Sequence, residues 1–401
     1  MSEKNGGEKY PGERNIGAIG EKSVMPGPTG AETKSDILVE RRGSAGLITL
    51  NRPKALNALS LQMIRDLSSI LRTWRSDPSV LLVAIRGTNK IGRPGTPESL
   101  FGGFCAGGDI RFFHQAALAG DLAALDDFFT EEYTLNHLIH NYPKPCIAFM
   151  DGIVMGGGMG ISQGAKVRIA TEKTKMAMPE TQIGLFPDVG GGYFLSRCPG
   201  HAGEYLALTG EVIGADEAIA FGLADIKCNA ARLPDLWADL GRRVFTSAID
   251  VEKWIATELV AENTYTIQPD DKIDAYFSLP RVKHIIDALE AADDPWAVKT
   301  AAKLRMRSPL MLHVTLEQIR RARSMNLADD LRMERDMVHH CFHLRPGAQS
   351  ETVEGVRALA IDKDYKPRWN PARIEDVKPG MADAFFASPW TAELHPLRDL
   401  C

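Results

Sequence analysis

The chain has 401 residues, of which 44% are hydrophobic and 25% are charged, an ordinary globular composition that allows one large domain or two modest ones. Its net charge of −5 gives no general attraction to nucleic acid, and because no run of about 18 apolar residues occurs, we expect no membrane span. The six scattered cysteines contain no C-x-x-C pair, and the adjacent His339 and His340 would face different directions on a helix. We therefore expect reduced thiols and no metal site.

The first half of the chain predicts a tail followed by strands that alternate with helices. Residues 1–34 are poor in hydrophobic side chains and predict a disordered tail, and the acids within it do not fit a typical transit peptide. After it, 37–51 predicts a hairpin and Ser60 predicts a helix cap. Residues 115–140 predict a helical region, 80–87 and 144–152 predict buried strands, and 166–171 predicts a further strand.

The second half predicts helices. Strand signals disappear from about residue 232, and segments with helical periodicity follow at 234–247, 281–292, 294–307, 309–324 and 328–342. The pattern divides the chain into an α/β part, residues 35–230, and a mostly helical part, residues 231–401.

Two glycine-rich segments each follow a predicted strand and open an apparent helix. FCAGGD (104–109) places Gly108 at one of these turns, and MGGGMG (155–160) places Gly157 at the other. Taken separately, the first segment fits a tight turn and the second fits close helix packing. Taken together, they can supply one backbone N–H each to a single oxygen, which is an oxyanion hole for a carbonyl that becomes an oxyanion or an enolate.

The segment MPETQIGLFPDVGGGY (178–193) carries two acids, Glu180 and Asp188, each directly after a proline. The prolines stiffen the corners that aim the carboxylates, and the apolar residues between the acids predict an apolar wall. A carboxylate in such a pocket can act as base or nucleophile, and two acids in one pocket hold their protonation states apart. The alternative is a pair of surface acids, one of which caps a helix that begins near Gly191.

In this order, the segments resemble those of the crotonase (enoyl-CoA hydratase/isomerase) superfamily. The resemblance implies an α/β fold with a ClpP-like ββα spiral core that carries the active site, followed by a C-terminal helical region. It also implies that Gly108 and Gly157 are the oxyanion-hole donors.

LNRPKALNAL (50–59) is similar to the segment of this superfamily that holds the nucleotide end of CoA. The resemblance therefore assigns Lys54, Ala55, Leu56 and, from FCAGG, Ala106 to substrate binding. Without it, Lys54 would be interpreted as a surface charge.

Further segments narrow the resemblance to a thioester-hydrolase branch: EEYTLN (131–136), 178–197 and EGVRALAIDKDYKPRWNP (354–371). Enoyl-CoA hydratases carry a second catalytic glutamate where this chain has Gly160, and glycine where it has Asp188. The resemblance implies Glu180 as the catalytic carboxylate, Asp188 as its partner, which orients water or binds the 3-hydroxyl, and Glu132 as a substrate-side acid. The alternative for Glu132 is an ordinary acid on an amphipathic helix. Whether Glu180 attacks the carbonyl directly or activates water stays open.

The implied activity is hydrolysis of the thioester of (S)-3-hydroxyisobutyryl-CoA, an intermediate of valine breakdown, to 3-hydroxyisobutyrate and CoA. 3-Hydroxypropionyl-CoA is a close second substrate, because one methylene-sized difference discriminates by only about 1–3 kcal/mol. The resemblance implies no metal or redox cofactor, and it is compatible with a homo-oligomer. The partner is the acyl-CoA substrate, without nucleic acid or membrane.

Two alternatives stay open. The first is an enoyl-CoA hydratase or isomerase, and the second is a non-catalytic structural subunit derived from the hydrolase. The presence of the three acids and both oxyanion glycines weighs against the second. A bacterial cytoplasm is favoured over a mitochondrial matrix because of the acidic N-terminus.

Overall fold

The main sheet is mostly parallel. The structure, a computed structural model, describes residues 35–92, 96–259 and 271–401, so the predicted tail 1–34 lies outside the described residues. Six strands follow the order β1-β2-β3-β4-β6-β8, in which only the β1–β2 pair is antiparallel, and β5 and β7 form a separate parallel pair. The strands are β1 (Ile37–Arg42), β2 (Ala45–Leu50), β3 (Leu82–Gly87), β4 (Cys146–Met150), β5 (Ile153–Met155), β6 (Val167–Thr171), β7 (Lys175–Ala177) and β8 (Ile226–Cys228).

The predicted hairpin and the three other predicted strands are confirmed. β1 and β2 form the hairpin, with Gly43 at φ +56° in its turn, and the other predicted segments form β3, β4 and β6. Along β3, Val83 faces one hydrophobic cluster and Ala84 faces another, and both clusters are buried. A strand with both faces buried reads as a continuous apolar run, which is why these strands were visible in the sequence.

Helices of the first half pack against one face of this sheet. Ser60 caps α1 as predicted, because its Oγ accepts from the backbone N–H of Met63 at 3.3 Å. The predicted helical region 115–140 is two helices, which separate at Gly120, where φ is +73°. The helices are α1 (Leu61–Ser76), α2 (Ile110–Ala119), α3 (Leu122–His140), α4 (Gly157–Gln163), α5 (Gly191–Leu195), α6 (Ala202–Thr209) and α7 (Ala215–Ala220).

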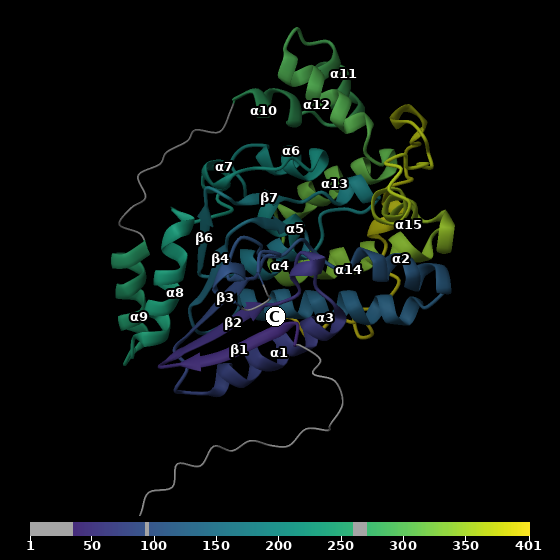
Figure 1. Cartoon of the computed structure of the whole chain (residues 1–401). Helices are drawn as coiled ribbons and strands as arrows, with labels where there is room; N and C mark the ends of the chain where they lie inside the picture. The colour runs from purple at the N-terminus through teal and green to yellow at the C-terminus, as the bar shows by residue number, and fades with distance from the viewer. Residues whose placement is uncertain (1–34, 93–95, 260–270) are drawn as a thin grey trace, which may run out of the picture. The chain divides into compact units, whose positions relative to one another are not determined.

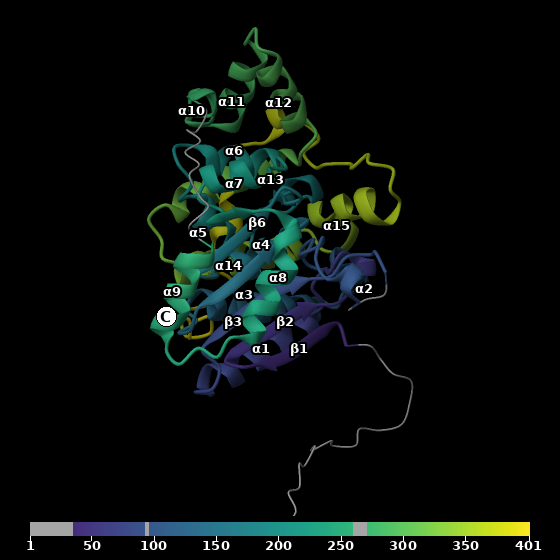
Figure 2. The same ribbon diagram turned by 60° about the vertical axis from the view of Figure 1, so that its left-hand side comes forward.

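The described residues of the second half form helices up to Ile361 and contain no strand, as the sequence predicts, whereas 362–401 are mostly turns and irregular backbone. Its helices are α8 (Leu233–Arg242), α9 (Ala248–Trp254), α10 (Asp271–Phe277), α11 (Val282–Glu290), α12 (Pro295–Arg305), α13 (Pro309–Ala322), α14 (Leu327–His343) and α15 (Glu351–Val356). α8 packs on the β1–β2 hairpin, on the side of the sheet away from α3 (Figure 1). α10, α11 and α12 lie together in both views (Figures 1 and 2).

The last helices return to the part of the chain that carries the predicted acids. α14 packs against α3 and α5, and α15 packs against α2 and the 3-10 turn η3 (Glu180–Ile183). The segment from Glu180 to Gly192 therefore lies between the sheet half and the helical half of one compact unit, Ser35–Cys401. None of the helices in the described ranges has the length and apolarity needed to cross a membrane.

Candidate active site

The two glycine-rich turns lie against each other. Cys105 forms an isolated parallel bridge with Val154 of β5, which brings the loop 104–109 alongside the start of α4. A β-carbon built on Gly157 would lie 3.3 Å from the backbone N of Gly108. The turns approach so closely because neither carries a side chain at this point.

Both predicted N–H donors are free to bind a ligand. Gly108 forms a bridge with Leu59, but that bridge uses the carbonyl of Gly107 and the N–H of Asp109 and leaves the N–H of Gly108 unused. Gly157 is the first residue of α4, where backbone N–H groups have no acceptor within the helix. The structure thus brings together the two donors that the sequence singles out.

A cavity of about 300 Å³ opens at these turns. The two oxyanion glycines and Ala106 line it, together with the three predicted acids Glu132, Glu180 and Asp188. Its other lining residues are mostly apolar, and none of the lining residues is basic. Because no cation is found among the described residues that line the cavity, burial and mutual repulsion have a large effect on the charge of these acids.

The three carboxylates are buried close to the N–H pair. Glu132, Glu180 and Asp188 are only 2%, 6% and 5% exposed. β-Carbons built on Gly156 and Gly157 would lie 2.7 Å from Oε1 of Glu180 and 2.7 Å from Oε1 of Glu132, respectively, so each glycine leaves room for one acid. Oε1 of Glu132 and Oε2 of Glu180 have no hydrogen-bond partner among the described residues. Buried unpartnered oxygens that border a cavity are suited to bind a substrate or water.

Burial raises the pKa of all three acids. The pKa values of Glu180 and Glu132 lie well above their ordinary value, first because of burial and then because of the charge of Asp188. Burial raises the pKa of Asp188 to about 7, and the hydrogen bond from Tyr133 opposes that rise. The cavity therefore holds fewer than three negative charges at neutral pH, and its acids titrate as a coupled group.

Tyr133 is a site residue that sequence analysis missed. It is fully buried, and its hydroxyl donates to Oδ2 of Asp188 at 2.9 Å. The only signal was its place beside Glu132 in EEYTLN. Its contact with a residue 55 positions away in the chain depends on the packing of α3 against the loop 184–190.

The predicted CoA-binding segment borders the cavity but does not line it. Lys54 is exposed and Leu56 is 41% exposed. The carbonyl of Leu56 accepts from the N–H of Ala106 at 3.0 Å, which fixes the segment to the loop of the oxyanion pair. The segment thus lies beside the cavity, in contact with its wall.

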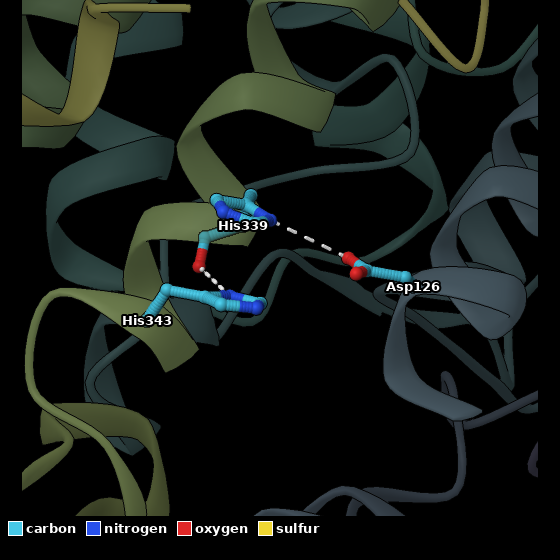
Figure 3. A group of neighbouring side chains, drawn as sticks. All are labelled: Asp126, His339 and His343. Atoms are coloured by element: carbon cyan, nitrogen blue, oxygen red, sulfur yellow. Dashed lines mark hydrogen bonds and ion pairs between the residues drawn. The ribbon is translucent and has the colours of Figure 1, made fainter. Parts of the chain in front are cut away.

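One cluster of possible metal ligands lies outside this cavity. The expectation of no metal site rested on the histidines forming no i,i+4 pair. This premise is wrong, because His339 and His343 are four residues apart and lie on one face of α14. Ligand atoms of these histidines and of Asp126 all lie within 4.8 Å of one another (Figure 3). However, Oδ1 of Asp126 accepts from the guanidinium of Arg335 at 2.6 Å. That cation neutralises the charge that would attract a metal ion, so the cluster fits an ion pair with histidines beside it.

Comparisons with known proteins agree with this architecture. The family described as enoyl-CoA hydratase/isomerase matches residues 45–386. The "3-hydroxyisobutyryl-CoA hydrolase, mitochondrial" of Gallus gallus is 38% identical over 88% of this chain and 89% of that protein. The "Probable 3-hydroxyisobutyryl-CoA hydrolase 3" of Arabidopsis thaliana is 40% identical over 88% of this chain and 92% of that protein.

A solved structure with the same fold is named after a different enzymatic activity. The crystal structure of a carnitinyl-CoA dehydratase from Mycobacterium thermoresistibile is 36% identical, with a TM-score of 0.76, and the match covers 88% of this chain and 97% of that one. This match extends over the C-terminal helices, so both halves of the described chain have a counterpart among solved structures. The expected crotonase fold with a helical C-terminal region is confirmed.

Proposed function

The chain belongs to the enoyl-CoA hydratase/isomerase family, and from this premise and the geometry of its cavity we propose that it hydrolyses the thioester of (S)-3-hydroxyisobutyryl-CoA. The relatives that carry this hydrolase name align with about nine-tenths of the chain. 3-Hydroxypropionyl-CoA, which lacks one methyl group, is the second substrate we propose. The reaction consumes only water and gives a hydroxy acid and free CoA.

One observation carries the proposal for hydrolysis over hydration. The position of the second hydratase glutamate is Gly160, and a β-carbon there would lie 2.7 Å from Cβ of Val189 and 2.8 Å from Nδ2 of Asn136. The packing leaves no room for a second acid at that place. The cavity instead has Asp188 next to Glu180, so the acids surround the carbonyl site rather than the two faces of a double bond.

In the proposed reaction the thioester oxygen lies between the N–H groups of Gly108 and Gly157. These donors stabilise the negative charge that develops on that oxygen when the carbonyl carbon is attacked. Glu180, whose carboxylate lies over Gly156, either attacks that carbon or removes a proton from the water that does. The C–S bond then breaks and the CoA thiolate leaves. If Glu180 is the attacking group, water then hydrolyses the resulting anhydride, which releases the hydroxy acid and regenerates the Glu180 carboxylate.

We assign the remaining acids to the hydroxyacyl group. Asp188, whose carboxylate accepts a hydrogen bond from Tyr133, either accepts a second hydrogen bond from the 3-hydroxyl group or orients the attacking water. Burial raises the pKa of Glu132 well above its ordinary value, and in its protonated form Glu132 donates a hydrogen bond to the same group. The nucleotide end of CoA lies along the segment 54–56, where the exposed Lys54 is available to its phosphates.

The test is release of CoA thiol from 3-hydroxyisobutyryl-CoA, 3-hydroxypropionyl-CoA and acetyl-CoA, with hydration of crotonyl-CoA measured in parallel. We expect rapid release from the two hydroxyacyl thioesters, slow release from acetyl-CoA and no hydration. Glu180→Gln should abolish the release. Hydration of crotonyl-CoA without thiol release would contradict the proposal and favour a hydratase.

A further inference from the structure

The backbone next to Asp188 has an unfavourable conformation. Val189 has φ +58°, in the left-handed region that a β-branched residue rarely adopts, and Gly190 follows with φ +86°. Val189 is buried and lines the cavity, where it fills the space over Gly160. Such a conformation persists only where surrounding contacts hold it, and it often marks a functional position.

A carboxylate from the helical half holds the residues that follow. Glu334 of α14 is fully buried, and its Oε2 accepts from the N–H of Gly190 at 2.7 Å. Its Oε1 accepts from the N–H of Gly192 at 2.9 Å. One side chain therefore accepts hydrogen bonds from the N–H groups of Gly190 and Gly192, in the turn that follows Asp188.

An amide from the neighbouring helix holds the residue before the corner. Gln318 of α13 is fully buried, and its Nε2 donates to the carbonyl of Pro187 at 2.6 Å and to Oε1 of Glu334 at 3.1 Å. Pro187, Gly190 and Gly192 are thus connected through two side chains. Asp188, between them, is fixed from before and after along the chain.

The chemistry of Glu334 is unusual for a residue that only fills space. It forms no ion pair with any residue in the described ranges, and its pKa lies well above the ordinary value because of burial and the nearby charges of Asp330 and Asp188. Burying an acid without a cation destabilises a fold, and an apolar side chain of similar volume would pack at lower cost. The acid is needed here to accept hydrogen bonds from the turn.

We propose that Glu334, together with Gln318, is a positioning residue that holds the strained Asp188 corner in the geometry required for thioester hydrolysis. The inference rests on the proposed function for its kinetic consequence but not for its structural one. Glu334 does not line the cavity and acts only through the backbone around Asp188. The proposal also makes the C-terminal helices part of the support of the active site, because α13 and α14 supply both side chains.

The decisive variant is Glu334→Gln, which keeps the shape but replaces one acceptor oxygen with an NH₂ group that faces a backbone N–H. The matched control is Asp336→Asn, because Asp336 lies on the same helix and is nearly as buried. Its Oδ1 contacts Ser388 at 2.8 Å and His395 at 3.3 Å, on the C-terminal tail instead of the active-site turn. Each protein is assayed for kcat and KM with 3-hydroxyisobutyryl-CoA and for hydrogen exchange of the amides of 188–193.

We expect Glu334→Gln to lower kcat by about 10- to 100-fold, as a displacement of about 1 Å does, with KM changed less than about threefold. The amides of 188–193 should exchange faster in this variant and at the wild-type rate in Asp336→Asn. Wild-type kcat in a Glu334→Gln protein, or an equal loss of kcat in both variants, overturns the inference. If Glu334→Gln does not fold, Gln318→Met removes the two amide bonds at similar volume and should show the same kcat loss and local exchange.

The two proposals fail in different ways. If the wild type hydrolyses no thioester, the proposed function is wrong, and exchange alone decides whether Glu334 holds the turn. If the wild type hydrolyses thioesters and Glu334→Gln matches it in kcat and exchange, only the positioning role is wrong.

Discussion

Tyr133 donates its phenolic hydrogen to Oδ2 of Asp188 at 2.9 Å, and both residues are buried. A hydrogen bond to a carboxylate stabilises its ionised form, so this bond lowers the pKa of Asp188 while burial raises it to about 7. The neighbour of Glu132 on α3 therefore sets the protonation of an acid on the loop that follows η3.

Tyr133→Phe tests this relationship. Without the hydroxyl, the pKa of Asp188 should rise further, and the acid limb of the pH profile of kcat/KM should move to higher pH. We expect a loss of about tenfold at pH 6 and a much smaller loss at pH 8, because a hydrogen bond to a charged group contributes about 1.5–3 kcal/mol. A loss that is the same at both pH values would show that Tyr133 does not act through the protonation of Asp188.

Glu180→Gln tests the link between activity and stability. Because burial raises the pKa of Glu180, the folded state favours the protonated acid, so its contribution to stability is present at low pH and is lost as pH rises through the raised value. The amide side chain of the Glu180→Gln variant is uncharged at every pH, so the variant does not lose stability in this way. We expect the variant to lose activity by about 10³-fold, yet to melt at a higher temperature than the wild type at pH 8, by roughly 2 °C or more.

The control for that experiment is Glu131→Gln. Glu131 precedes Glu132 on α3 and forms an ion pair with Arg65 at the surface. The substitution should leave kcat and the melting temperature at pH 8 nearly unchanged. A Glu180→Gln protein that is less stable than the wild type at every pH would show that the carboxylate is stabilised by the fold and not strained by it.

Gly157→Ala tests the shared space of the oxyanion turn and Glu132. The new methyl group would lie 2.7 Å from Oε1 of Glu132 and 3.3 Å from the N of Gly108, so either the acid or the donor pair must move. We expect kcat to fall by about 10²–10³-fold, the usual effect of losing one oxyanion donor. Gly214→Ala is the control, because a β-carbon there meets nothing within 4 Å and φ is −90°.

The residues that sequence analysis found are those with a local signal. Gly108, Gly157, Glu180 and Asp188 lie in short segments whose composition is hard to explain otherwise, and the structure places all four around one cavity. Buried parallel strands were visible for the same reason, since continuous apolar runs need no knowledge of their neighbours.

The residues that sequence analysis missed depend on contacts between distant parts of the chain. Glu334 reads as one acid among several on an amphipathic helix, and nothing near it in sequence indicates that its partners are Gly190 and Gly192. The division between 115 and 140 was also missed, because Gly120 is tolerated within a helical pattern and only its φ of +73° shows that it ends α2.

Asp126→Asn tests whether the cluster at α14 is an ion pair or a metal site. Arg335 is almost fully buried, and besides Asp126 its guanidinium contacts Oγ1 of Thr130 at 3.0 Å and the ring of Trp390. Removing the carboxylate charge should therefore lower the free energy of unfolding by about 1–3 kcal/mol. Neither dialysis against EDTA nor added Zn²⁺ should change the melting temperature of the wild type. A rise with Zn²⁺ that is absent in His339→Ala would contradict the ion-pair interpretation, because only a metal bound to the folded state stabilises in this way.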